Sequence, residues 1–144
     1  MQARQQVHAS CVSRNGDGVL LIGPSGSGKS DLALRLLGRG FTLVADDRVD
    51  IEDSIAAAPA GLAGLLEVRG LGIVRLPFAA TARLALVADL GGTGERLPAL
   101  GRHADLDLPL IRLDPAAASA PERIVLALDC ALGRVAQVAG AFAA

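Results

Sequence analysis

The chain contains the glycine-rich stretch Gly23-Pro24-Ser25-Gly26-Ser27-Gly28-Lys29-Ser30. The short apolar run at residues 19–22 precedes it and predicts a strand. Apolar residues at helical spacing follow it over residues 32–37, and Gly38-Arg39-Gly40 ends that pattern. A glycine-rich loop between a strand and a helix points its backbone N–H groups at phosphate oxygens, and the positive end of the helix lies behind it. The stretch therefore predicts a phosphate-binding loop in an α/β fold.

Two residues of this loop carry side chains suited to a bound nucleotide. Lys29 is expected to reach the β- and γ-phosphates, and the Ser30 hydroxyl is expected to be a ligand of Mg²⁺. Lys29 is also the one lysine among 14 basic residues, the others being arginine. A compact ammonium suits a phosphate cradle better than a planar guanidinium does. The loop thus predicts binding of ATP with Mg²⁺.

Acidic residues end two of the expected strands. Residues 41–45 predict a buried strand that ends at Asp46 and Asp47, and residues 83–90 predict another with Asp89 near its end. An aspartate at the end of a strand near a phosphate loop can hold the metal, and a second one can act as base toward an attacking hydroxyl. The spacing alone does not separate Asp46 from Asp89 as the metal-binding aspartate.

The rest of the chain gives a coarser outline. Residues 7–13 are expected to form one strand that a turn at residues 14–18 joins to the strand before the loop. Residues 48–52 predict a further strand, residues 53–64 a surface connection, and residues 96–114 give no clear pattern. Ser119-Ala120-Pro121-Glu122 has the form of a capping box and predicts the start of a final helix.

Composition limits the function classes. A chain of 144 residues that is 51% hydrophobic and 20% charged fits a single globular domain spanning residues 1–144. A net charge of −1 and 2% aromatic residues give neither attraction for polyanions nor surfaces for base stacking, which argues against nucleic acid. The chain has no apolar run of about 18 residues and no secretory signal, so we expect a cytoplasmic protein that does not enter a membrane. Cys11 and Cys130 are expected to be free thiols.

Four segments together resemble the catalytic domain of HPr kinase/phosphorylase, also called HPr serine kinase. They are the phosphate loop, His8-Ala9-Ser10, Leu43-Val44-Ala45-Asp46-Asp47-Arg48-Val49 and Leu66-Glu67-Val68-Arg69-Gly70-Leu71-Gly72-Ile73. The glutamate-arginine-glycine-leucine-glycine pattern in the last segment is far more specific than a phosphate loop. Enzymes of this family transfer phosphate from ATP to a serine of the phosphocarrier protein HPr, and many also remove it by phosphorolysis. The resemblance implies a P-loop core like that of phosphoenolpyruvate carboxykinase, with a mixed β-sheet and flanking helices.

Several roles follow from the resemblance by position. His8 becomes an active-site residue close to the phosphate chemistry, and Asp47 becomes the general base for the serine hydroxyl. Ser30 and Glu67 match magnesium positions, with Asp46 as the acidic neighbour of the base and a further metal ligand.

The resemblance also assigns roles outside this group. Arg69-Gly70-Leu71-Gly72 matches a loop that is important for catalysis, and Arg96 matches an essential arginine. His103 matches no position of the family.

The chain departs from the family in two places. The usual N-terminal domain is missing, which implies a short form or a fragment of the enzyme. Residues 114–123 replace the proline-glycine-arginine-asparagine loop that the family ties to the phosphorylase reaction and to subunit contact. We therefore expect a kinase with weak or absent phosphorylase activity, and a homo-oligomer remains open.

Two other functions fit parts of the sequence. A small-molecule kinase with a P-loop would share the phosphate loop and the acidic pair, and would act on a metabolite without HPr. A nucleotide-dependent sensor would bind ATP without turnover. The doublet Asp46-Asp47 together with Glu67 argues against the sensor, because mere binding needs fewer carboxylates near the γ-phosphate.

Overall fold

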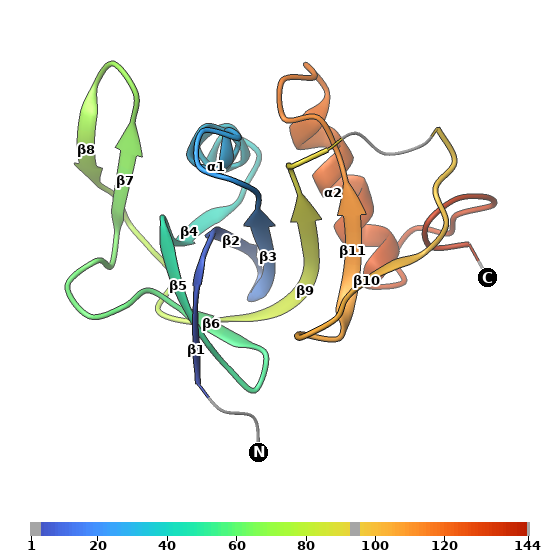
Figure 1. The fold of residues 1–144 in the computed structure, drawn as a ribbon, viewed down its shortest axis with the longest axis horizontal. Helices are drawn as coiled ribbons and strands as arrows, with labels where there is room; N and C mark the ends of the chain where they lie inside the picture. Colours follow the sequence, from blue (N-terminus) through green and yellow to red (C-terminus); the bar gives the residue numbers. More distant parts are fainter. Residues whose placement is uncertain (1–3, 93–95, 144) are drawn as a thin grey trace.

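The computed structural model describes residues 4–92 and 96–143. Within these residues the chain forms strands and two helices in the order β1 (Gln5–His8), β2 (Ser10–Arg14), β3 (Asp17–Ile22), α1 (Lys29–Leu37), β4 (Thr42–Ala45), β5 (Arg48–Glu52), β6 (Ile55–Ala57), β7 (Leu65–Val68), β8 (Gly72–Arg75), β9 (Ala82–Asp89), β10 (Gly101–His103), β11 (Leu108–Arg112) and α2 (Ala120–Ala131) (Figure 1). At 9 and 12 residues, the helices of the described chain are too short to cross a membrane.

Most strands join one mixed sheet. Its order is β1-β5-β6-β9-β3-β2-β4, and β11 lies parallel to β9 with β10 on its outer side. The first residues of β9 pair with β6, whereas its last residues pair with β11. Strands β3, β9 and β11 are parallel, so their carboxyl ends meet at one edge, with Ile22, Asp89 and Arg112 in register. The glycine loop starts at this edge.

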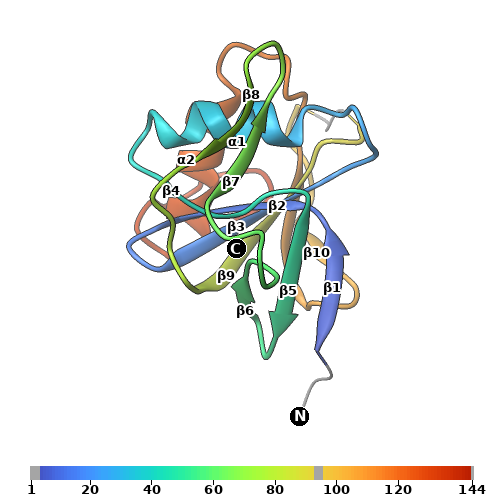
Figure 2. The same cartoon turned by 90° about the vertical axis from the view of Figure 1, so that its left-hand side faces the viewer.

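Apolar residues alternate between the two faces of the sheet. Val19 and Leu21 of β3 belong to a core cluster with α1 and α2, whereas Leu20 belongs to a second cluster on the opposite face. Figure 2 shows β1 and β5 running steeply across the direction of β2 and β3, so the sheet curls over that second cluster. Helices thus cover one face, and the curled sheet covers the other.

A separate hairpin stands beside α1. Strands β7 and β8 pair only with each other, and β7 contacts α1. In Figure 1 the hairpin rises at the left edge of the molecule. Leu66 is fully buried and fixes the hairpin to the body, whereas Leu71 and Ile73 are exposed.

The single strand expected over residues 7–13 is wrong. The chain forms β1, which pairs with β5, and then β2, which pairs with β3 and β4. The break falls at Ala9, whose N–H donates to the Asp47 carbonyl at 3.2 Å rather than to a neighbouring strand of the ladder. Apolar alternation gives the period of a strand but not its partner, so it missed the change.

Two further expectations need correction. The connection expected at residues 53–64 contains β6, whose Ala56 is buried in the sheet. Helix α2 does begin at Ala120, but Ser119 makes no capping hydrogen bond. Its hydroxyl accepts instead from Arg123 Nε at 3.0 Å, and Glu122 pairs with Arg39, so the reciprocal bonds of a capping box are not formed. The unassigned stretch before α2 contains β10 and β11.

Candidate functional site

The glycine loop lies between β3 and α1, as the sequence predicts. Gly28 caps α1 with φ of +101°, a conformation that residues with a side chain rarely adopt. The Ser27 N–H donates to the Pro24 carbonyl at 3.0 Å and closes a turn inside the loop. The backbone therefore curls at the amino end of α1, where the helix dipole favours an anion.

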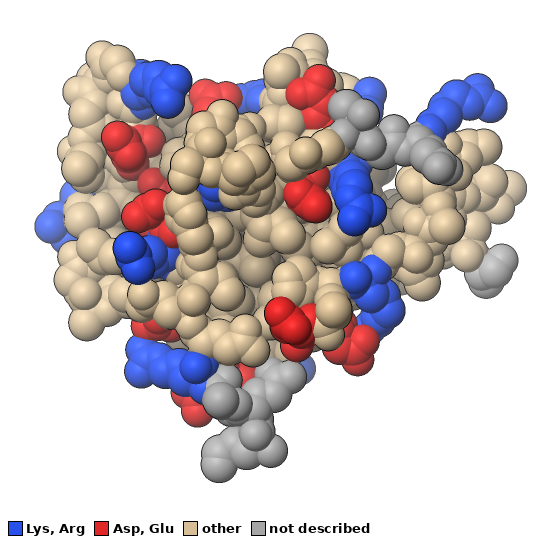
Figure 3. Space-filling model, in the orientation of Figure 1, with Lys and Arg blue, Asp and Glu red and all other residues tan. Residues whose placement is uncertain are grey.

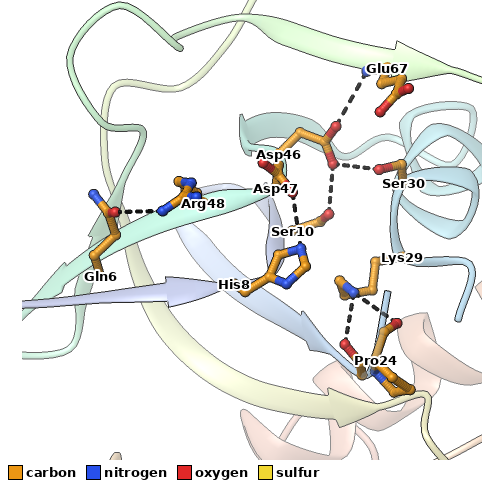
Figure 4. A network of polar contacts seen from close by, with 11 residues as sticks. Gln6, His8, Ser10, Pro24, Lys29, Ser30, Asp46, Asp47, Arg48 and Glu67 are labelled. Carbon is orange, nitrogen blue, oxygen red and sulfur yellow. Dashed lines mark hydrogen bonds and ion pairs between the residues drawn. The ribbon is translucent and has the colours of Figure 1, made fainter. Parts of the chain in front are cut away.

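Lys29 is folded back over this loop. Its side chain is buried, and Nζ donates to the carbonyl oxygens of Gly23 at 2.8 Å and Pro24 at 3.2 Å (Figure 4). The two carbonyls accept hydrogen bonds from two of the three N–H groups of the ammonium and hold it beside the glycine loop. The positive charge is thus fixed in place by the loop itself.

Asp46 connects three elements at the base of the site. Its Oδ1 accepts hydrogen bonds from the hydroxyls of Ser10 and Ser30, both at 2.7 Å, and its Oδ2 accepts from the Glu67 N–H at 3.3 Å. Only 8% of Asp46 is exposed. The carboxylate therefore ties the amino end of α1, the start of β2 and the β7–β8 hairpin together.

Asp47 faces the other way. Its backbone has a φ of +68°, and its side chain is exposed. Oδ1 of Asp47 lies 3.0 Å from His8 Nε2. Figure 4 shows the His8 ring below Asp47, with Lys29 to the right of the ring. Adjacent aspartates thus occupy two environments, one buried and one open to a partner.

One cavity of about 480 Å³ opens here, a size typical of small-ligand sites, and Asp46 is not among the residues that line it. The lining residues come from β1, β2, the glycine loop, α1, the β4–β5 connection and the hairpin: His8, Ser10, Ser25, Gly26, Gly28, Lys29, Ser30, Asp31, Leu34, Asp47, Glu67, Val68 and Arg69. Segments far apart in the sequence therefore meet at one site. Over the described residues of the face drawn in Figure 3, basic and acidic side chains are interspersed rather than gathered by sign.

Not every expected site residue reaches the cavity. Of the Arg69-Gly70-Leu71-Gly72 segment, only Arg69 is among the lining residues; Gly70 and Leu71 complete the turn of the hairpin, Gly72 begins β8, and Leu71 is 74% exposed. Arg96 is exposed and is not among the lining residues. Its place in the site rests on the resemblance.

The structure separates the two rival aspartates by their contacts. Asp89 ends β9 beside β3, but its carboxylate accepts from the Gly91 N–H at 2.8 Å and lies 3.7 Å from Arg112 Nε. Asp46 instead contacts Ser30 directly. Asp46 thus bonds to Ser30, whose hydroxyl is the expected metal ligand, whereas the carboxylate of Asp89 bonds to Gly91 and lies near Arg112.

Sequence reasoning missed the part that Ser10 plays. Ser10 is fully buried and its hydroxyl donates to Asp46, a role that the resemblance of His8-Ala9-Ser10 to the family does not predict. The available signal was its position two residues after His8, which places both side chains on the same side of an extended chain. The described residues hold no cluster of three or more His, Cys, Asp or Glu suited to a metal. The expected set of Ser30, Asp46 and Glu67 has two carboxylates.

Comparison with known proteins gives consistent results. The family model for the HPr serine kinase C-terminal domain matches residues 1–79. The HPr kinase/phosphorylase of Levilactobacillus brevis is 49% identical over 76 residues, covering 49% of this chain and 24% of that protein. The Clostridium tetani HPr kinase/phosphorylase is 47% identical over 76 residues, covering 50% and 25%. The chain thus spans about a quarter of the length of these curated relatives.

A solved structure extends the likeness in fold beyond residue 79. The Hpr(Ser) kinase/phosphatase from Coxiella burnetii superposes with a TM-score of 0.71 at 23% identity, covering 86% of this chain and 87% of that one. The large mixed sheet with its helices is therefore shared along most of the chain. Together with the family match over more than half of its residues, the chain belongs to the family of HPr serine kinase C-terminal domains.

Proposed function

We propose that this chain is an ATP- and Mg²⁺-dependent kinase that phosphorylates a serine of the phosphocarrier protein HPr. The observation that carries the proposal is the meeting of Lys29, Ser30, Asp47 and His8 around one cavity. Phosphoryl transfer depends on holding the phosphates, neutralising their charge and placing a base near the acceptor hydroxyl. Each of these tasks has a suitable side chain at this cavity.

The glycine loop is suited to hold the phosphates. Its backbone amides, the amino end of α1 and the ammonium of Lys29 all favour an anion at the same place. Among the described residues, Lys29 Nζ bonds to two main-chain carbonyls and to no carboxylate, so it can turn to a phosphate without breaking a salt bridge there. The loop therefore fits the phosphates of ATP.

The residues at the base of the site fit a magnesium ion. Mg²⁺ is usually bound by one or two carboxylates together with substrate phosphates and water, and Asp46 and Glu67 with the Ser30 hydroxyl supply such a set. When bound, the ion neutralises charge on the β- and γ-phosphate oxygens. Ser10 keeps its bond to Asp46 when Ser30 turns its oxygen elsewhere, so the carboxylate stays in place.

Asp47 is the proposed general base. Its carboxylate would take the proton of the acceptor serine as the serine oxygen bonds to the γ-phosphorus. The bond from that phosphorus to the β–γ bridging oxygen breaks, and its electron pair leaves with ADP. His8 bonds to the same carboxylate and limits its direction, and the two residues line the cavity together. The exposure of Asp47 leaves room for a protein acceptor.

The remaining assignments belong to the same proposal. Arg69 would contact phosphate or acceptor from the wall of the cavity. Arg96 would act only after moving toward the site, since it lies outside the lining in this structure. The proposal places the chain in the cytoplasm, where ATP is available.

One incubation tests the function. The chain is mixed with radiolabelled ATP, Mg²⁺ and purified HPr, and in parallel with HPr whose acceptor serine is replaced by alanine. We expect label on the first HPr only. Label on neither protein, with turnover of a metabolite instead, would indicate a small-molecule kinase, and ATP binding without any turnover would indicate a sensor.

A further inference from the structure

Arg35 fastens α1 to the segment that leads into α2. It lies on α1, six residues after Lys29, and its two terminal nitrogens donate to the carbonyl oxygens of Pro115 and Ala117, the latter at 2.9 Å. A planar guanidinium can serve two acceptors in a fixed geometry, which a lysine ammonium on a flexible stem does less well. Arg35 thus fixes the position of two residues on a different part of the chain.

That segment is compact and is also fixed at its other end. The Leu113 N–H donates to the Asp89 carbonyl at 3.2 Å, which joins the segment to the end of β9. The Asp114 carboxylate accepts from the Ala116 N–H at 2.9 Å, and the Asp114 carbonyl accepts from the Ala117 N–H at 3.1 Å. The segment is therefore a tight turn held between the sheet and Arg35.

The turn places Pro115 against the glycine loop. A Cβ built on Gly28 would lie 3.5 Å from Pro115 Cγ and 3.6 Å from Pro115 Cβ, which is ordinary van der Waals contact. Gly28 lines the cavity and caps α1, whereas neither Arg35 nor Pro115 is among the lining residues. Pro115 is thus a close neighbour of the last glycine of the loop, with room for about one methyl group between them, and it limits how far Gly28 can move toward the turn.

We propose that Arg35 is a positioning residue for the glycine loop: by holding Pro115 beside Gly28, it limits the movement of the loop and keeps its amides in the arrangement that binds phosphates. The inference rests on the proposed binding of ATP by this loop. An Arg35 that served only to join the helices would resemble Arg39, which pairs with Glu122 of α2 at 2.7 Å and has no hydrogen bond to the turn. Arg39→Gln is therefore the matched control.

The test measures ATP affinity and melting temperature in the presence of Mg²⁺ for the full chain. We call the contacts of Arg35 with the turn at residues 114–117 the brace. If the loop adopts its phosphate-binding arrangement only about a tenth of the time without the brace, Arg35→Gln raises the Kd of ATP about tenfold. Pro115→Ala has a similar effect, and the double variant is no weaker than the worse single one, because both changes remove the same brace. Arg35→Lys gives an intermediate Kd, and Arg39→Gln leaves it unchanged.

A second measurement needs no ATP. The Ser27 amide, which donates to Pro24 within the loop, should exchange its hydrogen faster in Arg35→Gln than in Arg39→Gln. Faster exchange with no ATP binding by the wild type would overturn the proposed function while supporting the brace. An Arg35→Gln protein that melts earlier but keeps its ATP Kd and its Ser27 exchange rate would overturn the inference. If Arg35→Gln does not fold, the same two measurements are made on Pro115→Ala. An unchanged ATP Kd and an unchanged Ser27 exchange rate in that variant would also overturn the inference.

Discussion

At the scale of single residues, Asp46 and Asp47 show how adjacent aspartates can occupy two environments. Asp46 bonds to Ser10 and Ser30 at the base of the site, whereas Asp47, whose backbone is in the left-handed conformation, bonds to His8. Asn and Asp tolerate this conformation better than most residues. An asparagine at either position therefore keeps the backbone while removing the carboxylate.

Replacement of Asp47 by Asn should leave ATP binding intact and slow transfer to HPr by roughly 10² or more, because the amide cannot accept the serine proton. Asp46→Asn should instead weaken the response to Mg²⁺, since it removes a proposed ligand of the ion. Transfer rates at several Mg²⁺ concentrations, with ATP affinity measured separately, distinguish the two. Normal transfer in Asp47→Asn, together with loss in Asp46→Asn that Mg²⁺ does not restore, would reverse the assignments.

Lys29→Ala should weaken ATP binding and reduce transfer by about 10² or more, because the loop keeps its backbone donors but loses its ammonium. Lys29→Arg is the charge-retaining control. We expect it to fail as well, since the bonds to Gly23 and Pro24 suit a compact ammonium better than a fork. Titration with ATP and a transfer assay provide the measurement, and unchanged values in Lys29→Ala would remove the basis for the phosphate-binding assignment.

Cys11 should make stability depend on alkaline pH. Burial raises the pKa of its thiol to about 12, above the value of about 8.5 for an unfolded chain. The unfolded state therefore loses its thiol proton first, so stability is complete below about pH 8.5 and falls as pH rises toward 12, by up to about 1.4 kcal/mol per pH unit. Urea unfolding at pH 8, 9 and 10 measures this fall in the free energy of unfolding. Cys11→Ala starts less stable but lacks this decline, so parallel curves for the two proteins would contradict the prediction.

At the scale of elements, local signals predicted what local interactions determine. The loop from β3 into α1 and the hairpin of β2 and β3 follow from glycines, turn residues and apolar spacing near the element itself, whereas the start of α2 was predicted from a capping box whose bonds are not formed. The split at Ala9, the insertion of β6 and the position of β11 depend on which distant strand is available for pairing. No local pattern encodes that choice.

The candidate site divides in the same way. The glycine loop and the doublet Asp46-Asp47 were recognisable as motifs, and the resemblance added His8 and Glu67. The buried hydroxyl of Ser10 and the brace from Arg35 were not predicted, because each acts through a residue more than thirty positions away.

Gly16 gives a prediction at this scale. Asn15 and Gly16 join β2 to β3 with φ of +54° and +85°, as the two central residues of a type I′ turn require. Space is open around Gly16, so Gly16→Ala should destabilise the protein through backbone strain alone, by about 1–2 kcal/mol. Gly92→Ala is the matched control, because it also has open space but no positive φ. Equal unfolding free energies for the two variants in urea would show that the turn tolerates a side chain.

At the scale of the whole molecule, the family match and the fold cover different parts of the chain. Residues 1–79 match the family model, yet β9 lies beyond them and pairs directly with β3, the strand that carries the glycine loop. The later residues also supply β11 and α2, and with them the turn that lies beside Gly28. The part of the chain that diverges most in sequence thus supports the part that resembles the family.

This divergence bears on the direction of the reaction. Phosphorolysis needs inorganic phosphate held next to phosphoserine, and so needs anion donors beyond those that hold ATP. The resemblance leads us to expect residues 114–123 in place of the family's arginine-containing loop, and the nearby arginines Arg112 and Arg123 interact with other residues. Arg112 lies 3.7 Å from Asp89, and Arg123 donates to Ser119, while neither lines the cavity.

We therefore expect a kinase with weak or absent phosphorylase activity. Lys29, the loop amides and His8 remain to bind one phosphate, but the described residues around the cavity offer only Arg69 as a further cation. The assay supplies seryl-phosphorylated HPr and millimolar phosphate without ATP, and follows the release of pyrophosphate. The forward reaction with the same preparation is the control for active protein. Pyrophosphate release at a rate comparable to the forward reaction would mean that Arg112 or Arg123 leaves its partner and binds the second phosphate, and substitution of each by Gln would identify which.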